Sequence, residues 1–215
     1  MADQIIAKVG IIVLVFAFSS TSQLKAQVKS SPQRSADADR SASVVTFADL
    51  PRTDGQKCSL SQYDQDYVVV CFTSNTCPYS VDYEQRLKQL QLKFQKEKLS
   101  AVVVAINSND HKDDSLQEMT GRAKQQKFNF DYLKDEDQSV AKAFDAVYTP
   151  EFFVLNSQRQ VIYQGALDDA TKPHDVTVHY VLKAIQSHRD GRPVEVAKTG
   201  ARGCRIRFAR RRRKP

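Results

Sequence analysis

The sequence predicts an α/β fold with a central mixed, mainly parallel sheet, an antiparallel edge hairpin and helices on both faces. Residues 67–72 and 101–106 are continuous apolar runs, which suit strands buried on both faces of a sheet. An amphipathic helical pattern at 78–96 separates them, and alternation of strand and helix favours parallel pairing. The apolar segments 152–155 and 161–163, joined by a polar turn, predict the antiparallel hairpin.

The elements before the second buried strand follow from local signals. Residues 44–47 are a short strand candidate, and Asp54-Gly55 indicates a hairpin that leads into residues 56–60. The helix at 78–96 has one apolar face, because apolar residues recur at spacings of four, three and four. These residues are Tyr83, Leu87, Leu90 and Phe94.

The second half of the domain continues the alternation. We expect a helix at 115–126, a short strand at 130–133 and a short helix at 139–144. A last helix is expected at about 175–188, and Gly191 ends it as a left-handed cap would. The inward residues of this helix are Val178, Val181, Leu182 and Ile185.

The N-terminus has the composition of an export signal. Lys8 precedes an apolar run at 9–18, which is too short to span a bilayer comfortably, and small and polar residues follow it. We expect a signal peptide at 1–26, cleaved near Ala26. The mature protein would then be periplasmic or secreted and would have no stable membrane span. An uncleaved membrane anchor is the alternative.

Charge is concentrated at the C-terminus. The 215-residue chain has a formal net charge of +7, and residues 202–214 carry eight positive charges and no acid, so the remainder has 7 − 8 = −1. We expect a disordered linker at 27–43, a folded domain at 44–204 and a basic disordered tail at 205–215. Export argues against nucleic acid as a partner of this tail. Weak attraction to an acidic envelope polymer or an anionic lipid stays open.

Export would carry four cysteines into an oxidising compartment. Four cysteines allow three complete pairings, and the sequence alone does not choose among them. Cys71 lies within a predicted buried strand, which favours an inert thiol. Cys58, on the early hairpin, is expected to have no catalytic role. Cys204 follows the last helix, in a segment that we expect to be mobile.

Cys77 lies at the junction between a buried strand and an amphipathic helix. Pro78 suits the first helical turn, where its missing N–H costs nothing, so Cys77 is expected at or beside the N-cap. The free N–H groups and the helix dipole at that position stabilise a thiolate, which is the nucleophilic form of cysteine. The alternative is a small apolar residue that only fills the junction.

Five short motifs make the chain resemble a known family. They are Cys77-Pro78, Asn107-Ser108-Asn109, Thr149-Pro150-Glu151, Asp168-Asp169 and Gly203-Cys204. Over residues 44–204 the chain resembles the thioredoxin-like redoxins of the alkyl hydroperoxide reductase/thiol-specific antioxidant type, in particular exported bacterial forms with a single Cys-Pro motif. The resemblance implies a thioredoxin-like fold, a redox-active Cys77 and a cis Pro150 that packs beside the reactive sulfur.

The site departs from several branches of this superfamily. Thioredoxins have their attacking cysteine where this chain has Ser74, so a local dithiol cycle is excluded. Cys77 occupies the position of the peroxide-attacking cysteine of peroxiredoxins. Their proline seven residues earlier is Val70 here, and their activating arginine is not evident near Thr149-Pro150. Thr73 replaces the first cysteine of the copper-delivering relatives, which disfavours copper.

The resemblance implies thiol-dependent oxidoreduction, in which Cys77 attacks a peroxide or a protein disulfide and an external thiol acts as reductant. Ser74, Thr76 and backbone N–H groups would orient the substrate, and Pro150 would lie beside the sulfur. Cys204 could reach back as the resolving cysteine, or it could be structural or without a partner. The alternative function is a non-catalytic thioredoxin-like binding module in the cell envelope.

No cofactor and no metal are predicted. The four histidines show no ligand spacing, and the sequence has no Cys-x-x-Cys-His haem motif. Asp168-Asp169 could bind a cation or position a loop, and a solvated turn is the simpler interpretation.

Overall fold

The computed structural model describes residues 44–209. The predicted signal peptide, the predicted linker and residues 210–215 of the predicted tail lie outside this part of the chain. The strands are β1 (Leu50–Pro51), β2 (Lys57–Cys58), β3 (Tyr67–Phe72), β4 (Ala101–Asn107), β5 (Asp131–Lys134), β6 (Tyr148–Thr149), β7 (Glu151–Leu155), β8 (Val161–Gly165) and β9 (Cys204–Arg205). The helices are α2 (Pro78–Lys96), α3 (Leu116–Gln126), α4 (Ser139–Phe144) and α5 (Tyr180–Arg189). Among the described residues, no helix is both long and apolar enough to cross a membrane.

A five-stranded sheet forms the centre of the fold, in the order β5-β4-β3-β7-β8. β3 pairs in parallel with β4, and β4 pairs in parallel with β5, through crossovers that contain α2 and α3. β7 runs antiparallel to β3, and β8 pairs with β7 as the predicted edge hairpin. The thioredoxin-like fold with a mixed sheet is therefore confirmed. Within this central sheet two pairings are parallel and two are antiparallel, whereas mainly parallel pairing was expected.

The direction of β7 follows from the shortness of α4. At a rise of about 1.5 Å per residue, the six residues of this helix span only about 9 Å, roughly half the length of a typical strand. The chain therefore does not return to the far end of the sheet after β5. It re-enters beside the carboxyl end of β3, where Glu151 pairs with Phe72, and β7 runs antiparallel.

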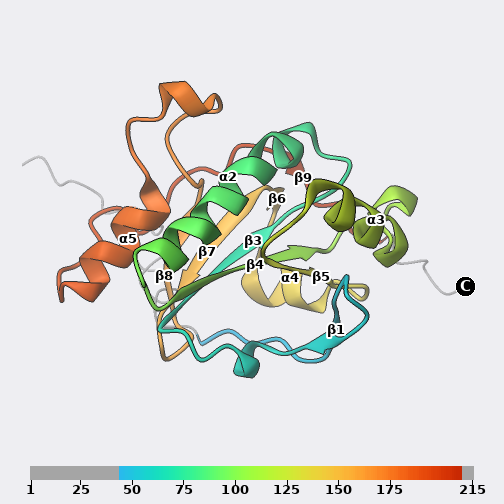
Figure 1. Cartoon of the computed structure of the whole chain (residues 1–215), viewed down its shortest axis with the longest axis horizontal. Coiled ribbons are helices and arrows are strands. Elements are labelled where there is room, and N and C mark those ends of the chain that lie inside the picture. The colour runs from blue at the N-terminus through green and yellow to red at the C-terminus, as the bar shows by residue number, and fades with distance from the viewer. Residues whose placement is uncertain (1–43, 210–215) are drawn as a thin grey trace, which may run out of the picture. The chain divides into compact units, whose positions relative to one another are not determined.

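Helices cover both faces of the sheet, as predicted (Figure 1). On one face, α2 and α5 pack against alternate sheet residues that include Val69, Cys71 and Phe152. α3 extends this face through Met119, which contacts Tyr132 of β5. The two buried strands β3 and β4 are thus enclosed from both sides, as their continuous apolar sequences require.

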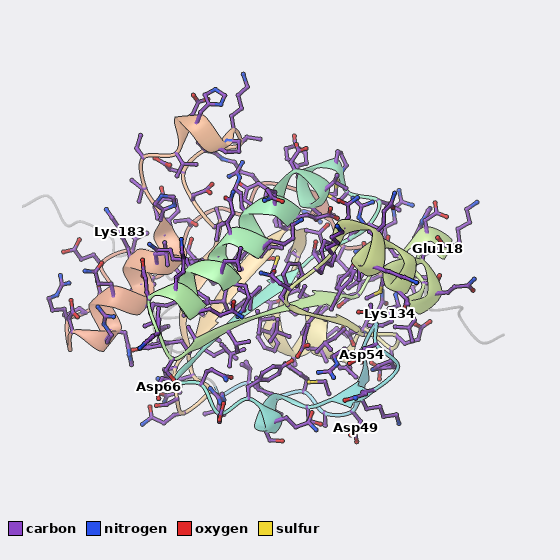
Figure 2. The ribbon with its side chains drawn as sticks, viewed as in Figure 1. Asp49, Asp54, Asp66, Glu118, Lys134 and Lys183 are labelled. Carbon is purple, nitrogen blue, oxygen red and sulfur yellow. The ribbon has the colours of Figure 1, made fainter. Side chains whose placement is uncertain are left out.

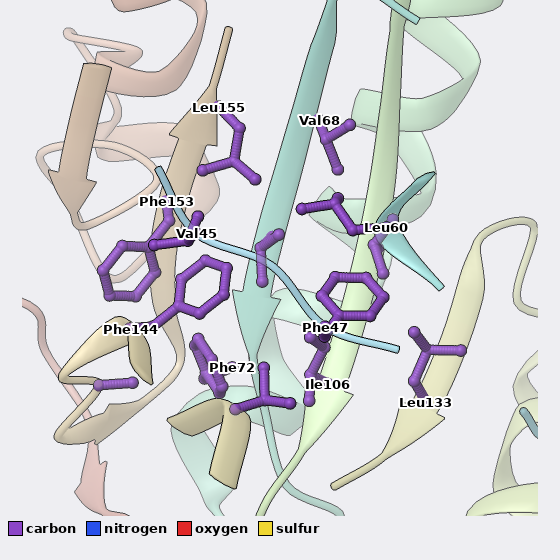
Figure 3. Packing of buried hydrophobic residues seen from close by; sticks show 14 of the residues in the cluster. Val45, Phe47, Leu60, Val68, Phe72, Ile106, Leu133, Phe144, Phe153 and Leu155 are labelled. Atoms are coloured by element: carbon purple, nitrogen blue, oxygen red, sulfur yellow. The ribbon is translucent and has the colours of Figure 1, made fainter. Parts of the chain in front are cut away.

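The opposite face is closed by α4 and by chain that precedes β3. Figure 3 shows Phe144 of α4 close to Phe72 and Phe153 of the sheet. The ring centroid of Phe144 lies 5.4 Å from that of Phe72 and 5.2 Å from that of Phe153, in edge-to-face geometry. Because the chain has no Trp, such phenylalanine clusters supply much of the large aromatic packing. They also anchor the end of α4, from which the chain turns towards Pro150.

Residues 44–47 do not form the predicted strand. Val45 and Phe47 are buried, in agreement with their alternation, but the only bridge in this segment is an isolated one between Val44 and Gln160. Alternating burial fits a docked extended segment as well as a strand. The early hairpin is present but short, since β1 and β2 have two residues each.

The last helix begins at Tyr180 rather than at about residue 175. The carboxylate of Asp169 accepts hydrogen bonds from the backbone N–H groups of Thr177 and Val178 and from the Thr177 hydroxyl. A side chain that captures these donors competes with helical hydrogen bonding, so α5 starts beyond them. Gly191 follows the helix with φ +68°, the left-handed conformation that was predicted.

The predicted boundary at residue 204 is also wrong. Arg205 belongs to β9, Ile206 is buried, and the backbone N–H of Ala209 donates to the side chain of Gln138. Arginines dominate the composition of this segment, but the buried side chain of Ile206 docks it onto the domain. The predicted tail is therefore ordered through residue 209.

Candidate active site

Strand β3 brings Cys77 to the carboxyl end of the sheet. The chain leaves β3 at Phe72, passes through residues 73–76 and enters α2 at Pro78, so Cys77 is the N-cap, as predicted. Its φ of −84° and ψ of 115° are extended, which is the usual conformation of an N-cap residue. Cys77 is only 2% exposed, so its sulfur is reached only past its immediate neighbours.

The loop before the reactive cysteine is held by Asp114, whose carboxylate is fully buried. This carboxylate accepts hydrogen bonds from Ser74 Oγ at 3.0 Å, Thr76 Oγ1 at 2.9 Å and the Asn75 N–H at 2.7 Å. Asn107 Nδ2, at the end of β4, adds a fourth bond at 2.7 Å. Four donors on one buried carboxylate fix the backbone that leads into α2.

The fold brings Ser74 and Thr76 to the site. Their hydroxyls were expected to face a substrate, but in the structure they donate to Asp114. Ser74 Oγ also accepts the N–H of Thr76 at 3.1 Å. The two hydroxyls therefore order the loop. No local sequence motif around Asp114 indicates this role. Its partner Ser74 lies 40 residues away in the chain, and only the fold brings the two together.

The Thr149–Pro150 peptide bond is cis, as the resemblance implied. The turn lies directly against the reactive cysteine, since Cys77 Sγ and the Thr149 carbonyl oxygen are 2.9 Å apart. Glu151 stabilises the turn, because its buried carboxylate accepts the N–H groups of Val147 and Tyr148 at 2.8 and 3.0 Å. The turn thus forms one wall around the Cys77 sulfur.

Cys204 lies beside Cys77 in an ordered strand, so the prediction of a mobile segment is wrong. β9 pairs antiparallel with β6, and Cys204 stands opposite Thr149. Figure 1 shows these two strands at the end of the sheet where α2 begins. A Cβ atom on Gly203 would lie 2.0 Å from the Thr149 carbonyl oxygen, so a glycine is required for this close approach.

The two thiols have opposite shifts in pKa. Burial raises the pKa of Cys77, but hydrogen bonds from the Cys204 side chain and from the backbone at Ser80 and Cys204 outweigh burial, and the net pKa is lowered. Burial and the neighbouring Cys77 sulfur raise the pKa of Cys204 to about 11. The Cys77 thiol donates a hydrogen bond to the Thr149 carbonyl oxygen at 2.9 Å, whereas the Thr149 side chain contributes to lowering the pKa of Cys77. The Cys77 thiolate therefore forms more readily than that of an ordinary cysteine, whereas Cys204 stays protonated near neutral pH.

The interaction between Cys77 and Cys204 can be tested by substitution. Cys204→Ala removes the side-chain donor and is expected to raise the pKa of Cys77, since a hydrogen bond to the thiolate stabilises the charged form. Because only the thiolate is alkylated, the midpoint of iodoacetamide labelling at Cys77 then moves to higher pH. Cys204→Ser retains a donor and should keep the midpoint low. An unchanged midpoint in Cys204→Ala would show that backbone donors alone set the pKa.

The other two cysteines are structural. Cys71 is fully buried in β3, and burial raises the pKa of its thiol well above the ordinary value. Cys58 is buried at the early hairpin, where its thiol donates to the Tyr63 hydroxyl at 3.1 Å, and burial again raises its pKa. Neither thiol has the lowered pKa of a reactive cysteine. All four cysteines are free thiols in this structure.

Asp168-Asp169 has structural partners. Asp168 forms a buried ion pair with Arg86 of α2 at 2.8 Å, and Asp169 captures the N–H groups before α5. Both carboxylates therefore position the chain between β8 and α5. Among residues 44–209, no group of three or more His, Cys, Asp or Glu side chains is arranged to hold a metal ion.

A thioredoxin-like fold with a cysteine of lowered pKa at a helix N-cap, beside a cis-proline turn, defines a thiol oxidoreductase of the redoxin class. The AhpC/TSA family matches residues 43–164. The chain belongs to the AhpC/TSA family and is a thiol-dependent oxidoreductase. No curated protein matches the chain.

Solved structures share the fold of this chain. An uncharacterized conserved protein from Geobacillus kaustophilus is 32% identical, with a TM-score of 0.69 over 76% of this chain and 89% of that one. A hypothetical protein from Sinorhizobium meliloti is 31% identical, with a TM-score of 0.68 over 77% of this chain and 92% of that one. Peroxidoxin BcpB from Mycobacterium tuberculosis is 22% identical, with a TM-score of 0.53 over 69% of this chain and 95% of that one, and shares the fold.

Proposed function

We propose that Cys77 is the reactive thiol of a peroxide-reducing enzyme and that Cys204 resolves its oxidised form. The observation that carries this proposal is that Cys77 and Cys204 meet at the cis-proline turn: Cys77 Sγ lies 2.9 Å from the Thr149 carbonyl oxygen, and Cys204 stands opposite Thr149. The lowered pKa of Cys77 and the raised pKa of Cys204 agree with it. A reactive cysteine needs a lowered pKa, and a resolving cysteine must lie within bonding reach of it. The geometry of the pair supports both roles.

In the first step the Cys77 thiolate attacks the terminal oxygen of a peroxide, ROOH. The S–O bond forms and the O–O bond breaks, so that sulfur loses two electrons and the peroxide gains them. The Cys204 thiol, which lies with Cys77 at the Thr149–Pro150 turn, can protonate the leaving alkoxide to ROH. Cys77 is then a sulfenic acid and Cys204 a thiolate.

In the second step the Cys204 thiolate attacks the sulfur of the Cys77 sulfenic acid. The S–S bond forms, the S–O bond breaks, and hydroxide leaves and is protonated to water. An external thiol reductant supplies the two electrons that return both residues to thiols. Asp114 takes no part in these steps; it positions the loop that precedes Cys77.

We predict that one equivalent of hydrogen peroxide converts the reduced protein to a form with an intramolecular Cys77–Cys204 disulfide. Peptide mapping under non-reducing conditions identifies the linked peptides. Cys58 and Cys71 serve as internal controls, because they should remain alkylatable after the protein is denatured. If Cys204 stays alkylatable while Cys77 is oxidised, an external thiol must resolve the sulfenic acid.

Thiol–disulfide exchange with a protein is the second candidate function. It is supported by the same pair, because a Cys77–Cys204 disulfide can exchange with substrate thiols. Assays of peroxide consumption and of insulin reduction, both with an artificial thiol donor, separate the two activities. A purely structural Cys77, as in a binding module, would be alkylated slowly and with a pKa of about 8.5 or above.

We also propose that the protein is exported and works in the periplasm or outside the cell. The short apolar run at 9–18 and the small-residue exit before Gln27 support this. N-terminal sequencing of the native protein is expected to find a chain that begins near Gln27. An intact Met1 chain in the cytosol would contradict export and would remove the argument from an oxidising compartment.

A further inference from the structure

We propose that Asn109 and Gln138 determine the oxidant range of Cys77, because they hold the C-terminal segment 199–209, here called the strap, over the reactive sulfur. This inference rests on the proposed function of Cys77 and deepens it. It identifies residues outside the reacting pair that favour small peroxides over protein disulfides as oxidants of Cys77.

The strap is fixed at its beginning against β8. The Thr199 hydroxyl accepts the N–H of Ala166 at 2.9 Å and lies 2.7 Å from the Tyr163 hydroxyl. The Thr199 N–H donates to the Gln164 carbonyl at 3.0 Å. A Cβ atom on Gly165 would lie 2.2 Å from Thr199 Oγ1, so this close approach also requires a glycine.

The end of the strap is held by two side-chain amides and by the backbone N–H of Asp110, which donates to the Arg207 carbonyl at 2.9 Å. Asn109 Oδ1 accepts the N–H of Arg207 at 2.9 Å, and Gln138 Nε2 donates to the carbonyl of Arg207 at 2.8 Å. Gln138 Oε1 accepts the N–H of Ala209 at 2.8 Å. Asn109 and Gln138 are each 3% exposed. Their side chains pair with backbone N–H and C=O groups of the strap, as a neighbouring strand would otherwise do.

Asn109 and Gln138 are themselves held in place by hydrogen bonds. The ammonium group of Lys134 of β5, which is labelled in Figure 2, donates a hydrogen bond to the Asn109 carbonyl at 2.8 Å. Gln138 Nε2 also donates to the Ser108 carbonyl at 2.7 Å. The backbone of Gln138 is left-handed, with φ +61°, which is unfavourable for a residue other than glycine. The fold therefore keeps a strained backbone where the side chain reaches the strap.

The strap decides what can reach the sulfur. With β9 on β6, Cys204 stands opposite Thr149, and Cys77 is 2% exposed. A hydrogen peroxide molecule has no backbone to accommodate, so fast side-chain motions around Cys77 are enough to admit it. A protein disulfide must bring its own backbone close enough to align its S–S bond with the Cys77 sulfur. That approach requires β9 to separate from β6. It also requires the hydrogen bonds between the strap and the side-chain amides of Asn109 and Gln138 to break.

The test uses full-length wild type, Asn109→Ala, Gln138→Ala and the double variant. Gln91→Ala is the matched control, because Gln91 is also a buried amide that accepts a backbone N–H, from Val103 at 2.8 Å, but lies between α2 and β4. Rates of Cys77 oxidation by hydrogen peroxide and by native insulin disulfides are measured. The insulin rate should rise roughly tenfold or more in the double variant, since several net hydrogen bonds to the strap are lost. The peroxide rate should change by less than about threefold.

Equal changes for both oxidants, or an unchanged insulin rate in all three folded variants, would overturn the proposal. Labelling of Cys77 by iodoacetamide and by a polyethylene-glycol maleimide provides a measurement without redox chemistry. The ratio of bulky to small labelling should rise in the strap variants and stay constant in Gln91→Ala; a constant ratio everywhere would exclude the strap as a barrier. If this ratio rises but neither oxidant reacts with wild-type Cys77, the proposed function fails while the barrier stands.

Discussion

Cys77→Ser is expected to abolish thiol-dependent turnover, with a loss of about 10³-fold or more in the rate of peroxide reduction. Serine preserves the size and the N-cap position, but its hydroxyl does not ionise near neutral pH and does not form the sulfenic acid on which the cycle depends. The measurement is peroxide consumption with an artificial thiol donor. Full activity in this variant would show that the reactive group lies elsewhere.

Cys71→Ala is the matched control for this variant. It also removes one thiol, six residues away in sequence, but Cys71 is fully buried in β3 between the sheet and α2. Its loss should destabilise the domain by about 1 kcal/mol through the small cavity left behind, and peroxide turnover should remain. Thermal unfolding and turnover measured on the same two samples separate loss of chemistry from loss of packing.

The elements that local sequence signals define were predicted with their observed bounds. β3, α2 and α4 begin and end where the apolar run, the helical periodicity and Pro78 indicated. The N-cap position of Cys77 follows from the same signals, because a proline in the first helical turn leaves little choice of starting residue. These are interactions between residues that are neighbours in the chain, and a sequence displays them directly.

The remainder of the site depends on contacts that no local pattern displays. Cys204 pairs with Thr149 across 55 residues, and its position after the last helix suggested a mobile segment. Glycine at 203 and a buried Ile206 hold the strand in place. Both are single residues, and the role of each depends on the part of the fold that it contacts. The cis-proline turn was identified only through the resemblance.

Asp114→Ala is expected to have the largest effect outside the reacting pair. It leaves the buried donors Ser74 Oγ and Asn107 Nδ2 without this acceptor. Each unsatisfied buried donor costs about 1–3 kcal/mol, so the free energy of unfolding should fall by about 2–6 kcal/mol. The loop that positions Cys77 loses its support, so alkylation of Cys77 should also slow in the fraction that remains folded. Urea denaturation and pH-dependent labelling are the two measurements.

A double-mutant cycle separates this network from a general loss of packing. Ser74→Ala removes one of the donors that Asp114→Ala leaves unpaired, so the second substitution should cost about 1 kcal/mol less in the Ser74→Ala background than in wild type. Asp114→Asn retains the volume and one acceptor oxygen, and its effect should lie between wild type and Asp114→Ala. If the two alanine substitutions simply add, Asp114 is not coupled to the loop through Ser74. The ordering of Cys77 must then come from α2 and the Thr149–Pro150 turn alone.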